Sequence, residues 1–534
     1  MDDIKQDVPV FLRSDTKIEP LACGWYAWGH LVPPVQHALN IAFRQLPLLR
    51  SFVSNPSVHE AAASDPELLG APFVQLQKAD VPQVANLLAS TVGDCANLIQ
   101  LAEGLMALHR QLQESANGFS LEGQYKTLPS CLRGLVELTY DLGNQPGVRI
   151  NEELSYCPEL DNSKTQQIAL FSTKDRDRAF FLNTPRLDSA ERLILPMPFA
   201  DRRFDLLAAS RIRPTSSSQL LDVLRVPEPL RERFLRYFST TPPPRNQPEY
   251  LGEEVRVRYF GHACVLIQTS KASILVDPML VGGPEEEEAT LTMNDLPDFI
   301  DYVFLTHNHQ DHLCPEILLQ LRSRIGKILV PRTNPSNLAD PSMKLILRAL
   351  GFDNVTVMDP LDSVPIADGE ITSLPFYGEH ADLSISGKHG LHLRLEGRTF
   401  AFLADANCVD RALYRRLIER LGKIDTLFIG MECDGAPLTW LYSPYLPRPV
   451  KRKDDESRRL SGSDSDRAWA VAEEIGCSRA FVYAMGQEPW LKHLCGLQYT
   501  AESKQIVESN KFVERCRDGG IPAERLYGCR EMLF

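Results

Sequence analysis

Residues 306–312 read THNHQDH and follow the apolar run YVFL, so three histidines and one aspartate gather at the end of an expected strand. His307 and His309 alternate, and alternating residues on extended backbone leave from the same face. A turn of the chain then brings Asp311 and His312 beside the first pair. Imidazole and carboxylate together suit zinc, iron or manganese, and a cluster this dense predicts a site for two metal ions.

The segments around this cluster predict its place in a fold. The run ASILVDP predicts a buried strand that ends at Asp277, and strand ends followed by loops are where α/β proteins place their chemistry. About ten apolar segments after residue 255 predict strands that alternate with helices. So many strands exceed one parallel sheet and favour two sheets flanked by helices.

A proline-rich stretch, STTPPPRNQPEY at 239–250, predicts the main domain boundary, because it continues neither a helix nor a central strand. We expect an N-terminal domain over 1–245 and a catalytic domain over 246–534. In the first domain, apolar residues at helical spacing predict a helix over 81–115, and FVQLQ, QQIALFS and RAFFLN predict short strands. The N-terminal domain is therefore expected to be a mixed α+β domain.

Three further segments have two interpretations each. CGWYAWGH at 23–30 is either a surface that binds a ligand or a cluster of aromatic residues that packs in a core or an oligomer contact. LTWLYSPYLP, with Trp440, Tyr442 and Tyr445, offers a pocket wall or a packed loop. RPVKRKDDESRRLSGSDSDR at 448–467 predicts a mobile, solvated loop whose basic residues offer contact with an acidic partner.

Composition excludes other classes of protein. A net charge of −13 argues against nucleic-acid binding, which needs a basic face. The N-terminus MDDIKQDVPV is acidic, which argues against a targeting segment. No apolar run reaches the roughly 18 residues that a membrane span needs, so we expect no membrane span. Twelve cysteines without a CxxC pair predict reduced, buried thiols. We expect a cytoplasmic protein.

Four sequence features together resemble the metallo-β-lactamase superfamily: the HxHxDH pattern, the strand before it, the upstream GHACVLIQTSKASILVDP (261–278), and LADAN around Asp405. The resemblance covers about 255–534 and implies an αβ/βα sandwich with a binuclear metal site at the edge between two sheets. It implies that His307 and His309 bind one metal, that Asp311 and His312 bind the other, and that Asp405 bridges them.

The chain departs from this superfamily at two positions. Where a histidine normally completes the first site, PFYGEH offers Glu379 and His380, and adjacent residues on extended backbone point to opposite sides, so only one of them is expected to reach the metal. The last strand, RAFVYAMGQEP, has no histidine for the second site. Glu432 in IGMECDG is the best-placed carboxylate, with Cys433 and Glu488 as competing donors.

This oxygen-rich donor set, the large N-terminal domain, and the GEH and MECDG segments resemble the di-iron β-hydroxylases of nonribosomal peptide biosynthesis, the type found in the chloramphenicol pathway. The resemblance implies two iron ions, with molecular oxygen and external electrons as co-substrates. It implies Glu379 as the third ligand of the first iron and Glu432 as that of the second. The implied substrate is an aminoacyl thioester on a peptidyl carrier protein, hydroxylated at its β-carbon.

The same resemblance implies that the N-terminal domain serves dimerisation and carrier-protein docking, and that an unidentified electron donor is needed. His262, Asp277, Tyr377 and His380 are candidates for supporting the ligands or lining the pocket. The substrate amino acid stays open between aliphatic residues such as leucine and aromatic ones. Two alternatives to a hydroxylase are a dizinc hydrolase of a lactone, thioester or phosphodiester, and a non-catalytic carrier-binding module.

Overall fold

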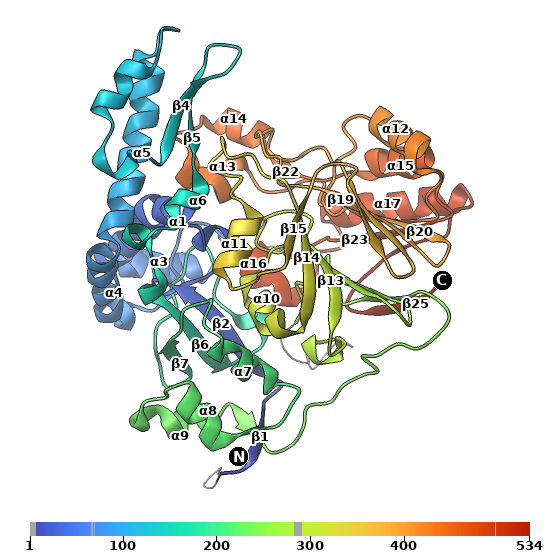
Figure 1. Cartoon of the computed structure of the whole chain (residues 1–534), viewed down its shortest axis with the longest axis horizontal. Helices are drawn as coiled ribbons and strands as arrows, with labels where there is room; N and C mark the ends of the chain where they lie inside the picture. Colours follow the sequence, from blue (N-terminus) through green and yellow to red (C-terminus); the bar gives the residue numbers. More distant parts are fainter. Residues whose placement is uncertain (1–6, 66–67, 69, 282–290, 497) are drawn as a thin grey trace.

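Two seven-stranded sheets face each other in the C-terminal part of the chain (Figure 1). The computed structural model describes residues 7–65, 68, 70–281, 291–496 and 498–534. The first sheet runs, in spatial order, β15 (Val355–Met358), β14 (Ile325–Pro331), β13 (Ile300–Phe304), β12 (Ser273–Val276), β11 (Val265–Gln268), β10 (Arg256–Tyr259) and β25 (Arg530–Leu533). Strands β12 to β15 are parallel, and β10, β11 and β25 are antiparallel.

The second sheet runs β16 (Ser363–Ile366), β17 (Gly369–Leu374), β19 (Gly390–Leu395), β20 (Arg398–Phe402), β21 (Thr426–Gly430), β23 (Arg479–Tyr483) and β24 (Ala523–Arg525). Apolar side chains of both sheets, including Val265, Phe304, Phe402 and Phe428, form the buried layer between them. Helices α12 (Ala412–Leu421), α15 (Ser465–Ile475) and α17 (Lys504–Asp518) pack on the outer face of the second sheet. Helices α10 (Pro315–Leu321) and α11 (Met343–Ala349) follow strands of the first sheet. The predicted αβ/βα sandwich is confirmed.

The N-terminal part is a mixed α+β structure, as predicted. One sheet has the order β3 (Trp25–Tyr26), β2 (Thr16–Ala22), β6 (Gln166–Ser172) and β7 (Arg192–Pro196), and a smaller one β8 (Thr215–Ser216), β1 (Pro9–Leu12) and β9 (Phe238–Ser239). A hairpin of β4 (Val136–Tyr140) and β5 (Pro146–Ile150) stands apart. The helices are α1 (Pro34–Asn40), α2 (Leu46–Ser54), α3 (Pro56–Ala63), α4 (Val81–Asp94), α5 (Ala96–Ser115), α6 (Glu152–Ser155), α7 (Arg203–Ala209), α8 (Ser217–Val223) and α9 (Arg231–Leu235).

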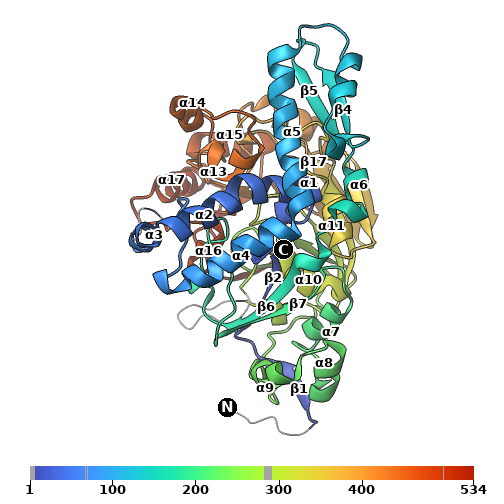
Figure 2. The ribbon, with the colours of Figure 1, turned by 90° about the vertical axis from the view of Figure 1, so that its left-hand side faces the viewer.

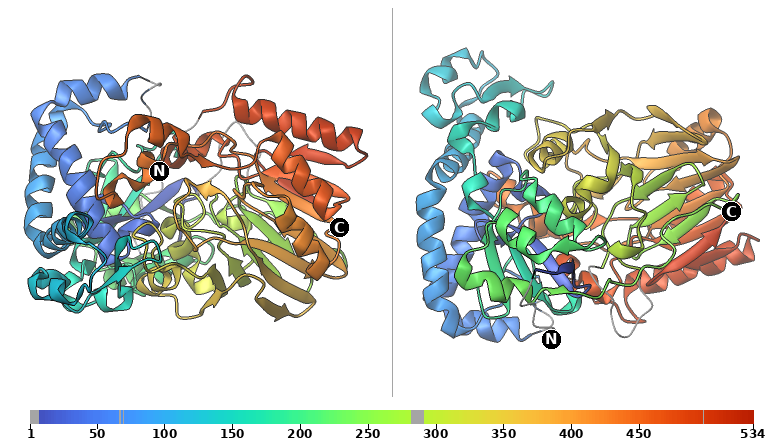
Figure 3. Two further views of the ribbon diagram at one scale, coloured as in Figure 1. Left: turned by 90° about the horizontal axis from the view of Figure 1, so that it is seen from above. Right: turned by 60° about the horizontal axis from the view of Figure 1, so that its bottom comes forward.

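Helices α2, α4 and α5 lie on the face shown in Figure 2. Figure 3 shows these blue helices at one end of the molecule and the red C-terminal helices at the other. None of the described helices is both long enough and apolar enough to cross a membrane. Strand β9 ends at Ser239 and β10 begins at Arg256, with neither helix nor strand between them, and the boundary at 245/246 stays a prediction.

Several local predictions were wrong. The helix expected over 81–115 is two helices, because α4 ends at Asp94 and α5 begins at Ala96. FVQLQ and RAFFLN are not strands, since backbone N–H groups there bond to loops and side chains; Phe181, for example, donates to the carbonyl of His493. The segment 448–467 is not a plain loop. It forms α14 (Arg452–Ser457), β22 (Leu460–Ser461) and the first residues of α15.

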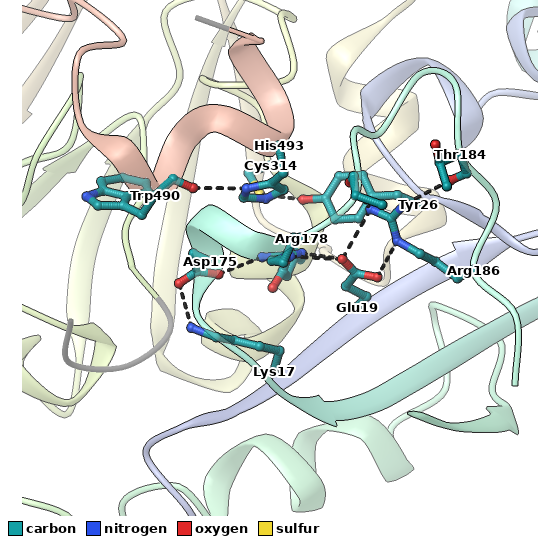
Figure 4. Close-up of polar contacts among 12 residues, drawn as sticks. Lys17, Glu19, Tyr26, Asp175, Arg178, Thr184, Arg186, Cys314, Trp490 and His493 are labelled. Atoms are coloured by element: carbon teal, nitrogen blue, oxygen red, sulfur yellow. Dashed lines mark hydrogen bonds and ion pairs between the residues drawn. The ribbon is translucent and has the colours of Figure 1, made fainter. Parts of the chain in front are cut away.

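A buried ion network joins the N-terminal sheet to the C-terminal part (Figure 4). Arg178 pairs with Glu19 at 2.6 Å and with Glu316 of α10 at 2.6 Å, and Asp175 lies 2.9 Å from the same guanidinium. All four side chains are almost fully buried. Because α10 begins shortly after THNHQDH, this network fixes the N-terminal part next to that sequence.

Candidate metal centre

The sequence THNHQDH lies in the loop after β13, at the edge where the two sheets meet. His307, His309 and His312 are buried there. Asp277 follows β12, Asp405 lies three residues beyond β20, and Glu432 lies two beyond β21. These strands are parallel to a neighbour, so their carboxyl ends meet at one edge. The fold thus gathers the predicted side chains from four separate strand ends.

Asp405 lies between two histidines. Its Oδ2 is 3.4 Å from Nε2 of His307 and 3.2 Å from Nε2 of His312. Three groups of described residues have ligand atoms within 4.8 Å of one another: His307, His309, Glu379 and His380; His307, His312 and Asp405; and His262, Asp311 and His312. The arrangement fits two neighbouring ions with Asp405 between them.

Asp277 and Thr306 fix the orientation of two of these histidines. His312 donates through Nδ1 to Asp277 Oδ2 at 2.8 Å, and the Thr306 hydroxyl donates to the same oxygen at 2.6 Å. The Thr306 oxygen then accepts from Nδ1 of His307 at 3.0 Å. Because both Nδ1 atoms are used as donors, the Nε2 lone pairs of His307 and His312 face Asp405, ready to bind metal. Asp277 therefore orients two candidate ligands, which agrees with the supporting role expected for it.

His309 is oriented the other way round. Its Nδ1 lies 3.0 Å from Oε1 of Glu379, and its Nε2 lies 2.7 Å from the hydroxyl of Tyr442 on α13 (Leu438–Tyr442). With Nδ1 offered to a metal, Nε2 carries the proton and donates to Tyr442. Tyr442, noted in the sequence only as a wall or packing residue, is thus a hydrogen-bond partner of a candidate ligand.

Glu379 and His380 both reach the cluster, and the expectation that they point to opposite sides was wrong. That expectation assumed extended backbone, whereas Glu379 has a φ of +65° after Gly378 at +78°. The turn directs both side chains toward His307 and His309, and the two rings of His309 and His380 lie 4.5 Å apart. Burial lowers the pKa of His380 to about 3, so this ring is neutral.

Tyr377 is not among the residues that line the cavity described below, and its role near the site stays a prediction. The turn at Gly378 leaves the Tyr377 side chain 44% exposed, and its carbonyl accepts from the backbone N–H of Asn407. Glu488 is used elsewhere too. Its Oε1 accepts from the Tyr259 hydroxyl at 2.5 Å and from the backbone N–H of His262 at 3.0 Å, so it holds the GHA loop in place.

His262 lies beside Asp311, with 3.3 Å between Nε2 and Oδ2. The backbone N–H of Gly486 donates to Nδ1 of His262 at 3.2 Å. A neutral imidazole whose Nδ1 accepts a hydrogen bond keeps its proton on Nε2, so this ring is a donor toward Asp311 and not a free metal ligand. The geometry supports His262 as a residue that orients Asp311.

The donor atoms themselves test whether metal fits. Nε2 of His307, Nε2 of His312, Oδ1 of Asp405 and Oε2 of Glu379 are buried and have no hydrogen-bond partner among the described residues. Buried polar atoms without a partner are costly. Burial and the carboxylates of Asp405 and Asp311 also raise the pKa of Glu432 well above its ordinary value. The residues therefore fit two bound cations.

A cavity of about 190 Å³ opens onto these donors. His309, Asp311, Glu379, Asp405 and Glu432 lie on its inner wall, and Trp440, Leu441, Leu460, Cys495 and Gly496 are among the residues that line the rest. Trp440 was a pocket candidate from the sequence. Cys495, whose thiol lies 3.6 Å from Oδ2 of Asp311, was missed, and no motif around it signals this position. Cys433 does not line the cavity.

Comparisons with known proteins agree with this geometry. The family described as "Diiron non-heme beta-hydroxylase N-terminal domain" matches residues 11–242, and the beta-lactamase superfamily domain matches residues 256–439. The 4-amino-L-phenylalanyl-[CmlP-peptidyl-carrier-protein] 3-hydroxylase of Streptomyces venezuelae is 34% identical over 97% of this chain and 98% of its own length.

Solved structures agree as well. The crystal structure of CmlA, a diiron beta-hydroxylase from Streptomyces venezuelae, matches with a TM-score of 0.92 at 32% identity, covering 99% of this chain and 100% of that one. A metal-dependent hydrolase from Ligilactobacillus salivarius is 25% identical over only 33% of this chain and 71% of its own length. Similarity to the hydroxylase extends through both parts of the molecule, whereas similarity to the hydrolase does not. This chain belongs to the family of di-iron β-hydroxylases, non-haem enzymes whose catalytic domain has the metallo-β-lactamase fold.

Proposed function

We propose that this enzyme hydroxylates the β-carbon of an aminoacyl group held as a thioester on the peptidyl carrier protein of a nonribosomal peptide synthetase. The observation that carries the proposal is the full-length similarity to a hydroxylase named for a peptidyl-carrier-protein substrate, with the buried carboxylate-rich centre intact. The proposed balance is one C–H bond, one O₂, two electrons and two protons giving one C–OH bond and one water.

We propose His307, His309 and Glu379 as the ligands of one iron, and Asp311, His312 and Glu432 as the ligands of the other, with Asp405 bridging. Iron held there supplies redox chemistry that zinc does not have. Glu432 lies on the cavity wall outside the three tight groups, so its role rests on the raised pKa and on its place in the same cavity as Asp405 and Asp311. His380 is left without a ligand role.

The chain's own residues do the positioning. Asp277, Thr306 and Tyr442 fix which nitrogen each histidine offers. Trp440, Leu441 and Leu460 give the cavity an apolar side on which an aliphatic or aromatic side chain can pack. These residues therefore hold the substrate near the centre.

The remaining parts of the proposal concern the assembly. Electrons come from an external donor, and the N-terminal domain, proposed as 1–245, serves dimerisation and carrier-protein docking. All twelve cysteines are free in the structure, which supports the proposed cytoplasmic site of action.

The test is metal analysis of anaerobically purified protein, followed by turnover. A carrier domain loaded in turn with L-leucine, L-phenylalanine and 4-amino-L-phenylalanine is offered with reductant and O₂, and the product is weighed by mass spectrometry. Two irons per chain and the gain of one oxygen atom on a loaded carrier are expected. Two zincs per chain, with no oxygen gained even after iron reconstitution, would leave a dizinc hydrolase instead.

A further inference from the structure

One segment of the chain runs from the protein surface to the metal centre. It begins at 448–453, where every residue except the partly buried Val450 is exposed, continues through α14 and ends in β22. Strand β22 pairs with β18 (Glu379–His380), with Ser461 opposite Glu379 and Leu460 opposite His380. Arg459 and Leu460 line the cavity. The surface part of this segment therefore lies at the edge of the cavity.

Contacts of α14 confirm this position. Asp455 of α14 accepts from the backbone N–H of Thr439 at 2.8 Å and from its hydroxyl at 2.6 Å. Thr439 precedes the cavity residue Trp440 in α13. Figure 1 shows α13, α14 and β22 near one another in orange. The basic residues just before α14 and in its first turn are thus beside the cavity entrance.

The charge of this surface is opposite to that of the whole chain. The stretch 448–459 carries six basic and three acidic residues, in a protein with a net charge of −13. Asp455 is used by Thr439, and Glu456 pairs with Arg452 at 2.7 Å. Lys451 and Lys453 are exposed and form no ion pair with any residue in the described part of the chain. Two lysine ammonium groups without an ion-pair partner among the described residues therefore lie where a substrate would enter.

We propose that the basic segment, residues 448–453, which contacts the N-terminal domain through Arg448 and Glu114, is the part of the carrier docking surface next to the cavity and binds acidic side chains beside the carrier's pantetheine arm. This inference rests on the proposed function. A thioester tether joins its carrier through a phosphodiester, which is an anion, so the body of the carrier and an anionic linkage both come to the cavity entrance when the aminoacyl group is inside. Cations beside an entrance in an otherwise acidic protein steer such a partner to it.

The mechanism predicts a salt-dependent effect. Attraction between exposed charges is screened over about 8 Å at physiological salt, so it acts mainly on encounter and is strongest at low ionic strength. Reversing Lys451 and Lys453 to glutamate turns the attraction into repulsion. We expect the Kd and the KM for a loaded carrier to rise about 10-fold at low salt, an effect of the size that steering produces.

The experiment compares K451E/K453E with R416E/R420E. Arg416 and Arg420 are exposed on α12, which Figure 1 shows away from α14, and their reversal changes the net charge by the same amount. A fluorescently labelled holo-carrier domain gives Kd by anisotropy, and the same domain loaded with an aminoacyl group gives KM. The neutral pair K451Q/K453Q is expected to fall between wild type and K451E/K453E. Iron content reports whether each variant keeps its centre.

The expected result is weaker carrier binding for K451E/K453E, a flatter salt dependence, and wild-type values for R416E/R420E. Equal effects of the two reversals, or wild-type Kd and KM for K451E/K453E, would overturn the docking surface and leave the hydroxylase proposal standing. A wild-type enzyme that binds the carrier but never oxidises its aminoacyl group would overturn the proposed function instead, while Kd still tests the surface.

Discussion

Replacement of Tyr442 by phenylalanine is expected to weaken iron binding without changing any ligand. The Tyr442 hydroxyl lies 2.7 Å from Nε2 of His309, and both residues are buried. Removing the hydroxyl leaves the Nε2–H of His309 without an acceptor, which costs about 1–3 kcal/mol. It also frees His309 to take the tautomer in which Nδ1 carries the proton. Loss of such a partner of a metal ligand typically weakens metal binding by about 10- to 100-fold.

The assay is anaerobic competition for ferrous iron between the protein and a coloured chelator. Tyr414 provides a matched control, because its hydroxyl is buried and has no partner among the described residues. Tyr414→Phe should bind iron like wild type, and Tyr442→Phe should lose iron first from the site that holds His309. Iron affinity of Tyr442→Phe within about 2-fold of wild type would show that the hydrogen bond does not orient His309.

Three further changes test other parts of the structure. Glu432→Gln should lower the iron content from two ions to one per chain, measured by metal analysis, whereas retention of both would remove Glu432 from the ligand set. Arg178→Met leaves Glu316 buried without its cation, whereas Glu19 keeps Arg186 and Asp175 keeps Lys17, and should cost about 3–5 kcal/mol in urea unfolding; an unchanged midpoint would contradict this. Burial raises the pKa of Glu152, which accepts from Ser342, to about 7. Because this folded pKa exceeds the ordinary 4.5, the free energy of unfolding is highest below pH 4.5 and falls as pH rises through about 7. The fall amounts to about 3 kcal/mol, and it should be absent from the pH profile of Glu152→Gln.

The metal loop was predictable from the sequence because its donors are close neighbours in the chain. Spacing within THNHQDH fixes which side chains share a face, and an apolar strand before it fixes where the loop lies. Asp277 was predictable for a related reason, as a strand-end acid beside the same edge. Local pattern alone therefore located five of the side chains that the fold brings together.

Residues that approach the site from distant loops were not predictable in the same way. Tyr442 and Cys495 reach the centre because α13 and α16 (Lys492–Cys495) pack over the loop, which no local pattern encodes. The segment 448–467 was misread because polar composition favours a loop, whereas pairing of β22 with β18 is a long-range contact. Glu379 and His380 were misread because a left-handed residue breaks the alternation that extended backbone implies.

Backbone strain gathers at this centre. His262, Asp277, Glu379, Ala404 and Ala484 all have φ between +38° and +65°, without being glycine, and all lie at strand ends or turns around the ligands. Each such residue costs of the order of 1 kcal/mol or more, and it persists only where the surroundings hold it. Here the surroundings are the hydrogen bonds of the turns, such as that from the N–H of Ala484 to the carbonyl of His262. The strain also has a use, because at Glu379 it directs two adjacent side chains into one cluster. Bound cations would offset the repulsion among the buried carboxylates, so metal and strained turns stabilise the same conformation.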